Sequence, residues 1–235
     1  MVKRWVIPDI HGCWHTLRTL IENQIVPSHE DQLFFLGDYI DRGKFSKQVL
    51  DYLIYLQSEG YATVFIRGNH EDVLLRCYEN QQKPTKIGFY TLQESWFQFG
   101  GEATLKSFGV EDVLQIPEHY ISFLRTMPYF WIQEKEILVH AGLNFLIENP
   151  FSDQLAMLWA KNYTIQPQKI HHKRLIHGHT PKTFDYILQQ LENSTYELCL
   201  DNGCVFYKEE GLGNLLALEL NSHTLLVQPN LDKEK

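Results

Sequence analysis

The sequence lacks several features that mark large classes of protein. It has no stretch of about 20 apolar residues, the length that a helix needs to cross a bilayer. It also lacks an excess of positive charge, because 21 Lys and Arg residues face 29 Asp and Glu residues, for a formal net charge of −8. That balance argues against non-specific binding to nucleic acid or to a membrane surface. We therefore expect a soluble protein with neither nucleic acid nor a membrane as its partner.

Cysteine is scarce, and its placement fits no cysteine-based metal site. The chain contains four cysteines without the paired spacing of such sites, namely Cys13, Cys77, Cys199 and Cys204. The N-terminal apolar run spans only a few residues, which is too short for a secretory signal. These absences favour a reducing, cytoplasmic environment.

Repeats and low-complexity segments are absent as well, and the order of the apolar segments indicates one α/β domain over residues 1–235. Short apolar runs without clean alternation predict buried strands at 5–7, 33–36, 63–66, 137–139 and 175–176. Helical patterns lie between several of these strands, at 14–23, 46–58 and 71–79. Strand-like runs return at 196–200, 215–220 and 224–227, and we expect them to complete a second sheet.

The segment of residues 80–131 differs from the rest in being rich in aromatic residues and poor in β-branched ones. Its helix-like spacing predicts a helical insertion beside the site. The aromatic side chains are either packing residues or the walls of a slot that stacks a nucleobase.

Five short polar blocks follow five of the predicted strands. They are DIHG at 9–12, GDYIDRG at 37–43, GNHE at 68–71, HAG at 140–142 and HGHT at 177–180. Each block alone has an ordinary structural explanation, such as a helix cap or a buried histidine bonded to backbone. In open α/β sheets, however, the loops that leave the carboxyl ends of the strands meet in one crevice. The five blocks together therefore predict a single site.

The residue types in these blocks indicate a pair of divalent cations. Carboxylate, imidazole and amide oxygen ligands without thiolate suit Mn, Fe or Zn ions better than a structural cysteine-zinc site. Two ions leave a net positive centre that attracts phosphate even in an acidic protein. Metals roughly 3.5–4 Å apart can bridge a hydroxide that attacks phosphorus in line. The pattern predicts hydrolysis of a phosphate ester without a covalent intermediate.

In order and spacing, the blocks resemble those of the calcineurin-like metallophosphoesterases, and above all the phosphoprotein phosphatase branch with its bacterial and phage lambda-type serine/threonine phosphatases. The resemblance runs from residue 9 to residue 180, with a weaker match in DNGC at 201–204. It implies a metallophosphoesterase-type β-sandwich, that is, two packed mixed β-sheets flanked by helices. It also implies two divalent ions, with Mn²⁺ first, held by Asp9, His11, Asp38, Asn69, His140 and His179.

The same resemblance implies roles for the other polar residues of the blocks. His70 would be the general acid that protonates the leaving oxygen, and Asp41 would orient it, which suits a histidine held by a carboxylate. Arg42 would clamp the phosphate, because a guanidinium matches phosphate in bidentate geometry. Asn69 would lie beside the phosphate as well as the second metal. Arg67 is either a further phosphate contact or a surface salt-bridge partner.

Two positions depart from what the resemblance leads us to expect. Many bacterial relatives have Trp-x-Arg where this chain has WAK at 159–161, so Lys161 would offer phosphate a point charge in place of a fork. Pro181 stands where nuclease and nucleotidase branches carry a second histidine, which favours the phosphatase branch. His177 is expected to lie outside the metal shell.

The leading hypothesis is a metal-dependent phosphatase that acts on phosphoserine or phosphothreonine in proteins. The alternatives are a symmetrical dinucleoside tetraphosphate hydrolase, which takes a nucleotide as substrate, and a non-catalytic scaffold of the same fold. The metal ligands cannot separate the two enzymes. A base-stacking slot flanked by cations would favour the nucleotide, and an open groove would favour a peptide.

Overall fold

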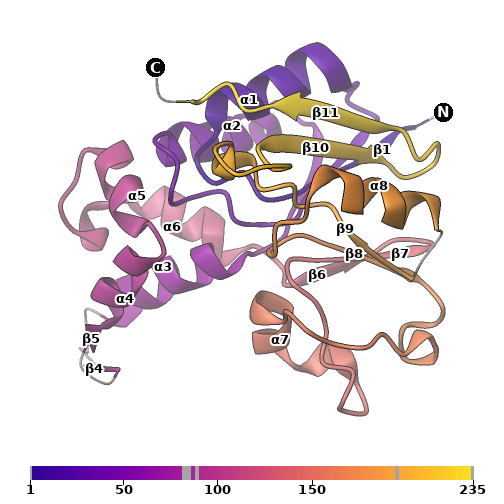
Figure 1. The fold of residues 1–235 in the computed structure, drawn as a ribbon. Helices are drawn as coiled ribbons and strands as arrows, with labels where there is room; N and C mark the ends of the chain where they lie inside the picture. Colours follow the sequence, from indigo (N-terminus) through magenta and orange to yellow (C-terminus); the bar gives the residue numbers. More distant parts are fainter. Residues whose placement is uncertain (1, 81–85, 88–89, 194–195, 234–235) are drawn as a thin grey trace.

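The computed structural model of the chain describes residues 2–80, 86–87, 90–193 and 196–233. Residues 81–85 and 88–89 of the predicted insertion lie outside this part. Two sheets stack on one another in Figure 1, and a group of helices extends from one side of them. Among the described residues, no helix combines the length and the apolar character needed to cross a membrane.

The first sheet has five strands in the order β11-β10-β1-β2-β3. Its strands are β1 (Arg4–Ile7), β2 (Gln32–Phe35), β3 (Ala62–Phe65), β10 (Asn214–Glu219) and β11 (Leu225–Pro229). The second sheet has the order β6-β7-β8-β9, with β6 (Phe130–Ile132), β7 (Glu136–Val139), β8 (Arg174–His177) and β9 (Glu197–Cys199). Strands β1, β2 and β3 run parallel to one another, as do β7, β8 and β9. Both sheets also carry antiparallel strands, so both are mixed, as predicted.

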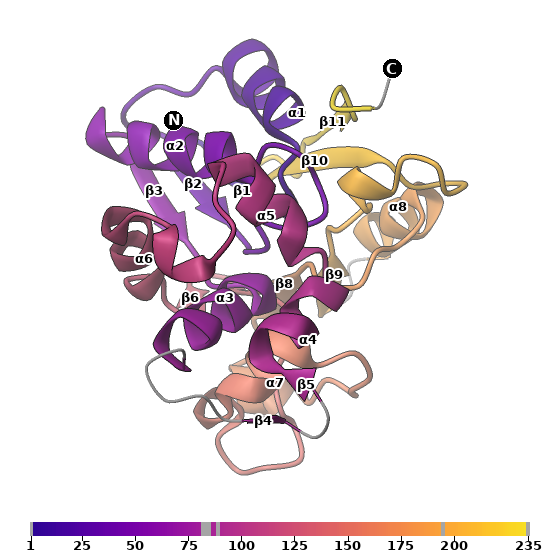
Figure 2. The same ribbon diagram turned by 90° about the vertical axis from the view of Figure 1, so that its left-hand side faces the viewer.

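Eight α-helices connect and flank these strands in the described part of the chain. They are α1 (Trp14–Thr19), α2 (Ser46–Ser58), α3 (Asn69–Asn80), α4 (Leu92–Gln98), α5 (Gly101–Phe108), α6 (Glu118–Arg125), α7 (Gln154–Trp159) and α8 (Phe184–Glu192). A π-helical segment, Leu20–Ile25, continues α1. A short hairpin of β4 (Lys86–Ile87) and β5 (Tyr90–Thr91) precedes α4. Figure 2 shows helices α3 to α6 together on one side of the molecule, where α4 contacts α3 and α5 contacts α2.

The central core lies between the two sheets. Val6 and Phe34 from the first sheet pack in one cluster with Leu138 and Ile176 from the second, and Ile187 of α8 joins them. The opposite face of the first sheet is covered by a second cluster that includes residues of α1, α2 and α6. Both faces of the central strands are therefore buried, which explains why their sequences are continuous apolar runs.

All five predicted strands of the N-terminal and middle segments are present, and helix α2 matches its predicted range. The prediction for the C-terminal runs was wrong in part. Only β9 joins the second sheet, whereas β10 pairs antiparallel with β1, with Trp5 opposite Glu219. Strand β1 would otherwise leave one row of backbone N–H and C=O groups unpaired, and β10 covers that edge.

Candidate metal centre

The polar blocks meet where the carboxyl ends of the parallel strands of both sheets face one another. Two groups of ligand atoms form there, each with its atoms within 4.8 Å of one another. One group contains His11, Asp38 and His70, and the other contains Asp38, His140 and His179. The Asp38 carboxylate belongs to both, as expected of a bridging ligand.

One oxygen of Asp38 faces three imidazole rings. Oδ2 lies 3.4 Å from Nε2 of His140, 3.5 Å from Nε2 of His11 and 3.8 Å from Nε2 of His70. Asn69 completes the second group, because its Oδ1 lies 2.8 Å from Nε2 of His140 and 3.0 Å from Nδ1 of His179. All these side chains except that of His179 are buried, so they are held where water competes little.

Backbone carbonyls fix the tautomers of two of the rings. Nδ1 of His11 lies 2.9 Å from the carbonyl oxygen of Ile40, and Nδ1 of His140 lies 3.0 Å from that of Leu36. A carbonyl only accepts hydrogen bonds, so each Nδ1 carries the proton and donates it. Each Nε2 therefore carries no proton and lies within 3.5 Å of Asp38 Oδ2, an arrangement that suits a metal-ligating histidine.

The charge states also suit metal ligands. Burial lowers the pKa of His11 and of His140, and burial together with the nearby His140 lowers the pKa of His179 to about 3. These rings are thus neutral near pH 7 and keep a free lone pair. Burial alone would raise the pKa of Asp38, but the surrounding histidines hold it well below its usual range.

Asp9 lies beside the two groups rather than in them. Both its carboxylate oxygens accept a hydrogen bond from the backbone N–H of His179, at 3.1 Å. Burial, Asp201 and Asp38 raise the pKa of Asp9, and burial raises that of Asp201 to about 7. Three buried carboxylates in one place repel one another unless cations lie between them.

These observations fit a pair of divalent ions. Acceptor atoms converge from five loops, and His140 Nε2 and His179 Nδ1 approach to 3.2 Å. Oδ1 of Asn69 lies between them, 2.8 Å from Nε2 of His140 and 3.0 Å from Nδ1 of His179, so three acceptor atoms face one another. Bound cations would satisfy these acceptors and offset the repulsion between the carboxylates.

Two glycines of the blocks are required by close approach to the carboxylates. A Cβ on Gly68 would lie 2.2 Å from Oδ1 of Asp38, and one on Gly178 would lie 2.0 Å from Oδ1 of Asp9. Gly68, which precedes Asn69, therefore leaves room for Asp38, and Gly178, which precedes His179, leaves room for Asp9.

Backbone strain is concentrated at the centre. Nine non-glycine residues of the described chain have positive φ, and five of them belong to the polar blocks. They are His11 (46°), Asp38 (51°), Asp41 (70°), Arg42 (65°) and His179 (68°). Such conformations cost about 1–3 kcal/mol each and persist where the surrounding structure enforces them, commonly at functional sites.

His70 and Asp41 form a buried pair next to the first group. Nδ1 of His70 lies 2.7 Å from Oδ2 of Asp41. Burial acts to lower the pKa of His70, but the carboxylates of Asp38 and Asp41 outweigh it and raise the pKa above its ordinary value. In contrast to the three neutral histidines, His70 therefore favours the protonated form and can donate a proton.

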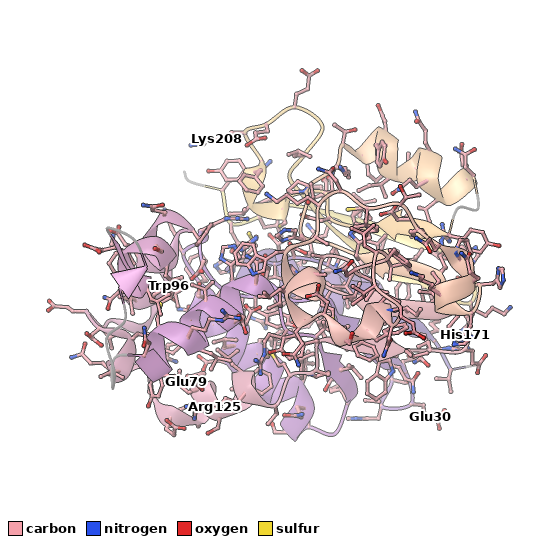
Figure 3. All side chains as sticks on the ribbon, turned by 90° about the horizontal axis from the view of Figure 1, so that it is seen from below. Glu30, Glu79, Trp96, Arg125, His171 and Lys208 are labelled. Carbon is pink, nitrogen blue, oxygen red and sulfur yellow. The ribbon has the colours of Figure 1, made fainter. Side chains whose placement is uncertain are left out.

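The helical insertion supports this pair, which the sequence did not indicate. The indole N–H of Trp96 donates to Oδ2 of Asp41 at 2.8 Å, and the hydroxyl of Thr104 donates to Oδ1 at 2.6 Å. The backbone N–H of Asp41 in turn donates to Oγ1 of Thr104 at 2.9 Å. Trp96 is fully buried, and Figure 3 labels it in the insertion. One aromatic residue of the insertion thus holds a candidate catalytic carboxylate.

A family model, the calcineurin-like phosphoesterases, matches residues 2–208 of this chain, which includes every polar block. The chain belongs to this family. Its members use divalent metal ions, so the phosphoesterase fold and a metal-dependent hydrolytic chemistry are established together.

Among curated proteins, this phosphoesterase is 27% identical over 232 residues to the asymmetrical bis(5'-nucleosyl)-tetraphosphatase of Anoxybacillus flavithermus, an alignment that covers 86% of this chain and 85% of the relative. It is 30% identical over 145 residues to the symmetrical bis(5'-nucleosyl)-tetraphosphatase of Erwinia tasmaniensis. That alignment covers 60% of this chain and only 45% of the relative, so the match spans less than half of the symmetrical enzyme.

Solved structures share the phosphoesterase fold at low sequence identity. The structure of a proposed diadenosine tetraphosphatase superposes with a TM-score of 0.63 at 18% identity, covering 99% of this chain and 95% of the other. The cold-active protein-tyrosine phosphatase of a psychrophilic Shewanella superposes with a TM-score of 0.58 at 16% identity, covering 97% and 80%.

The cations predicted to bind phosphate occupy different positions in this phosphoesterase. Nη1 of Arg42 lies 2.6 Å from Nε2 of His11, directly at the centre. Lys161 is exposed and lies close enough to His179 to lower its pKa further. Arg67 bonds instead to Tyr129 and to the carbonyl oxygen of Arg125, at 3.1 and 2.9 Å, which ties the end of β3 to the end of the insertion.

Two further side chains bear on the site. His177, which belongs to neither ligand group, bonds through Nε2 to Glu197 at 3.1 Å. Glu71 was not singled out by sequence, yet its buried carboxylate accepts hydrogen bonds from the backbone N–H groups of Asp38, Tyr39 and Gly68 at 2.8–3.0 Å. Glu71 thereby joins the loop that carries the bridging carboxylate to the loop that carries Asn69.

Proposed function

We propose that this phosphoesterase hydrolyses dinucleoside tetraphosphates by breaking a phosphoanhydride bond between the two nucleosides. The observation that carries the proposal is a cluster of metal-type ligands beside the hydrogen-bonded His70–Asp41 pair, in a chain that aligns along most of its length with a bis(5'-nucleosyl)-tetraphosphatase. This substrate was the alternative from sequence, and the relatives support it better than the phosphoprotein hypothesis.

In this proposal the two divalent ions share one ligand, Asp38, and differ in the others. Asp9, His11 and Asp38 would hold one ion, and Asp38, Asn69, His140 and His179 would hold the other. When bound, the two ions supply positive charge for the phosphoryl oxygens and an activated water. Mn²⁺ is the first candidate, and Fe and Zn also suit mixed nitrogen and oxygen ligands.

The phosphate chain is held by residues on two sides of the centre. Arg42 can present its guanidinium fork to one phosphate, and Lys161 contributes a point charge near His179. Asn69, whose Oδ1 lies among the metal ligands, would also face the phosphate. Arg67 does not contact the phosphate in this proposal, because Tyr129 and backbone carbonyls already engage its guanidinium.

The reaction transfers one phosphoryl group to water. A bond forms between the water oxygen and the attacked phosphorus, while the bond from that phosphorus to a bridging oxygen breaks. The bridging oxygen leaves with the second nucleotide, and Nε2 of His70 donates a proton to it where one is needed. Attack at an outer phosphorus releases a mononucleotide and a nucleoside triphosphate, whereas attack at an inner phosphorus releases two diphosphates or the same unequal pair.

A phosphoprotein substrate remains the second candidate. It was the leading hypothesis from sequence, and a protein-tyrosine phosphatase and a yeast serine/threonine phosphatase share the fold. Their identities of 15–16% extend the likeness to the fold alone. The substrate must therefore be decided by direct competition between the two classes.

The test compares kcat/KM of the purified chain with Mn²⁺ on diadenosine tetraphosphate and on phosphoserine, phosphothreonine and phosphotyrosine peptides. Anion-exchange chromatography of the nucleotide products also distinguishes equal from unequal cleavage. Asp38→Ala is the matched control, because it removes the bridging ligand and should abolish turnover of every substrate. A preference for any phosphopeptide over the dinucleotide would refute the proposed substrate.

A further inference from the structure

A hollow of about 330 Å³ lies beside the metal centre, between the loop that follows β2 and the segment that precedes β10. Arg42 and Lys44 line it from the first loop, and Val205, Phe206, Tyr207 and Lys208 line it from the second. We call it the Phe206 pocket. Its size falls in the range of small-molecule sites in proteins.

Arg42 connects the Phe206 pocket to the metal centre. Its Nη1 lies 2.6 Å from Nε2 of His11, while its Cζ lies 5.1 Å from the centroid of the Phe206 ring. The same guanidinium thus faces the metal ligands on one side and an aromatic ring on the other. A phosphate held by Arg42 would therefore lie close to both the metal ligands and the Phe206 ring.

The lining combines aromatic surface with positive charge. The rings of Phe206 and Tyr207 are partly exposed, and the ammonium groups of Lys208 and Lys233 lie 5.7 and 6.0 Å from the Tyr207 centroid. Figure 3 shows Lys208 at the edge of the molecule. Nucleobases stack on such rings, and lysines attract the phosphate groups of nucleotides.

The acidic groups at the rim do not cancel this charge. Glu209 and Asp232 line the pocket as well. The carboxylate of Asp232 accepts hydrogen bonds from the backbone N–H groups of His15 and Thr16, both at 3.0 Å, at the start of α1. Three cationic side chains, Arg42, Lys44 and Lys208, stand against these two carboxylates, so the lining carries one positive charge in excess.

We propose that the Phe206 pocket binds the base and ribose of a 5'-nucleotide whose terminal phosphate lies at the metal centre. Arg42, Lys44 and Lys208 would face its phosphate chain. This inference rests on the proposed function and names the subsite through which a nucleotide is distinguished from a phosphopeptide. From sequence, the aromatic residues of the 80–131 insertion were either packing residues or the walls of a base-stacking slot, and this proposal assigns such a slot to residues 205–207 instead.

The test measures the dissociation constants of AMP and ribose 5-phosphate for the Mn²⁺-loaded protein by isothermal titration calorimetry. The two ligands differ at C1′ of the ribose, where AMP carries the base and ribose 5-phosphate carries a hydroxyl. The ratio of their dissociation constants therefore reports the contact with the base and cancels any change at the phosphate. We expect AMP to bind at least tenfold more tightly than ribose 5-phosphate to the wild-type protein. In Phe206→Leu the ratio should fall to within about twofold of unity, consistent with the size of a base-stacking contact.

Tyr55→Leu is the matched control. Tyr55 is an exposed aromatic residue on α2 that stacks on Tyr52, outside the Phe206 pocket, and its replacement should leave the ratio unchanged. Lys208→Gln alters only an exposed side chain and provides a second variant should Phe206→Leu fail to fold. It should raise KM for diadenosine tetraphosphate several-fold relative to that for p-nitrophenyl phosphate.

Two results would overturn the assignment. The first is equal binding of AMP and ribose 5-phosphate by the wild-type protein. The second is loss of the ratio in Tyr186→Leu but not in Phe206→Leu, because Tyr186 lines a separate hollow with Lys161 and Lys182. Calorimetry does not depend on turnover, so inability to hydrolyse the dinucleotide would refute the proposed function and leave the nucleotide subsite standing.

Discussion

Replacing His70 with Asn removes the imidazole that donates to Asp41, and the resulting loss of activity should depend on the leaving group. General acid catalysis typically contributes a factor on the order of 10²–10⁴, equivalent to about 3–5 kcal/mol of activation free energy. An alkoxide such as that of serine needs the proton and should show the full loss. A p-nitrophenolate or the phosphate oxygen of an anhydride is a stable anion, so the loss should be smaller by at least tenfold.

The assay compares kcat/KM of wild type and His70→Asn on phenyl phosphate and p-nitrophenyl phosphate, and determines bound metal by plasma mass spectrometry. Nε2 of His70 lies in the same 4.8 Å group as the ligand atoms of His11 and Asp38, so coordination is the rival role. Loss of metal from the variant, or an equal fall in rate for both esters, would contradict the assignment of His70 to proton transfer.

The pH profile gives an independent check on the same pair. His70 acts as an acid only while protonated, so its contribution is complete below its pKa and disappears as the pH rises through it. The carboxylate of Asp41 raises that pKa, and Asp41→Asn should therefore move the alkaline limb of kcat/KM to lower pH. A limb that stays in place or moves upward would show that Asp41 does not act through His70.

Four further outcomes are expected. Mn²⁺ at 100 times its dissociation constant should stabilise the wild type in thermal unfolding by about 2.7 kcal/mol for each ion bound, and Asp38→Ala should abolish that gain. Glu71→Gln turns an amide toward backbone N–H groups that Glu71 now satisfies, which should cost about 1–3 kcal/mol per orphaned donor in urea unfolding. Thr104→Val removes the 2.6 Å hydrogen bond to Asp41 and should lower kcat with little change in KM. Burial acts to raise the pKa of Glu219, but hydrogen bonds, led by that from the Arg4 N–H, lower the pKa to about 2. The ionised Glu219 should therefore stabilise the fold by roughly 1.5–3 kcal/mol above pH 4.5, and this stabilisation should be lost as the pH falls toward 2. The urea midpoint of Glu219→Gln should lack this pH dependence.

Sequence reasoning was most successful where one strand and the loop after it are enough to locate a residue of the site. The continuous apolar run of β2 and the glycine-flanked carboxylates after it locate Asp38 without knowledge of the rest of the chain. The partner of β10 could not be deduced in this way, because pairing with β1 joins residues more than 200 positions apart. Its apolar run suits either sheet, and only the uncovered edge of β1 decides between them.

The supporting residues of the site were hidden for a different reason. Trp96 and Thr104 lie on helices where an aromatic or a threonine is ordinary, and nothing in their neighbours marks them as partners of Asp41. Glu71 was visible in its block, yet its task of accepting backbone N–H groups from another loop depends on a fold that brings residue 38 beside residue 71. Local patterns thus identify groups that perform chemistry, and they leave out the groups that position them.

The roles of the histidines depend on the partner of the second ring nitrogen. In His11 and His140, Nδ1 donates to a backbone carbonyl, which carries no charge, so burial dominates and the ring stays neutral with no proton on Nε2. In His70, Nδ1 faces the Asp41 carboxylate, whose charge helps to overcome the same burial and favours imidazolium. Three rings of similar exposure, each with Nε2 near Asp38, thus divide into two that suit metal binding and one that suits proton donation, in line with the roles proposed for them. Because Trp96 and Thr104 both donate to the Asp41 carboxylate, the insertion helps to set this division, although its described residues include neither a proposed metal ligand nor the proposed acid.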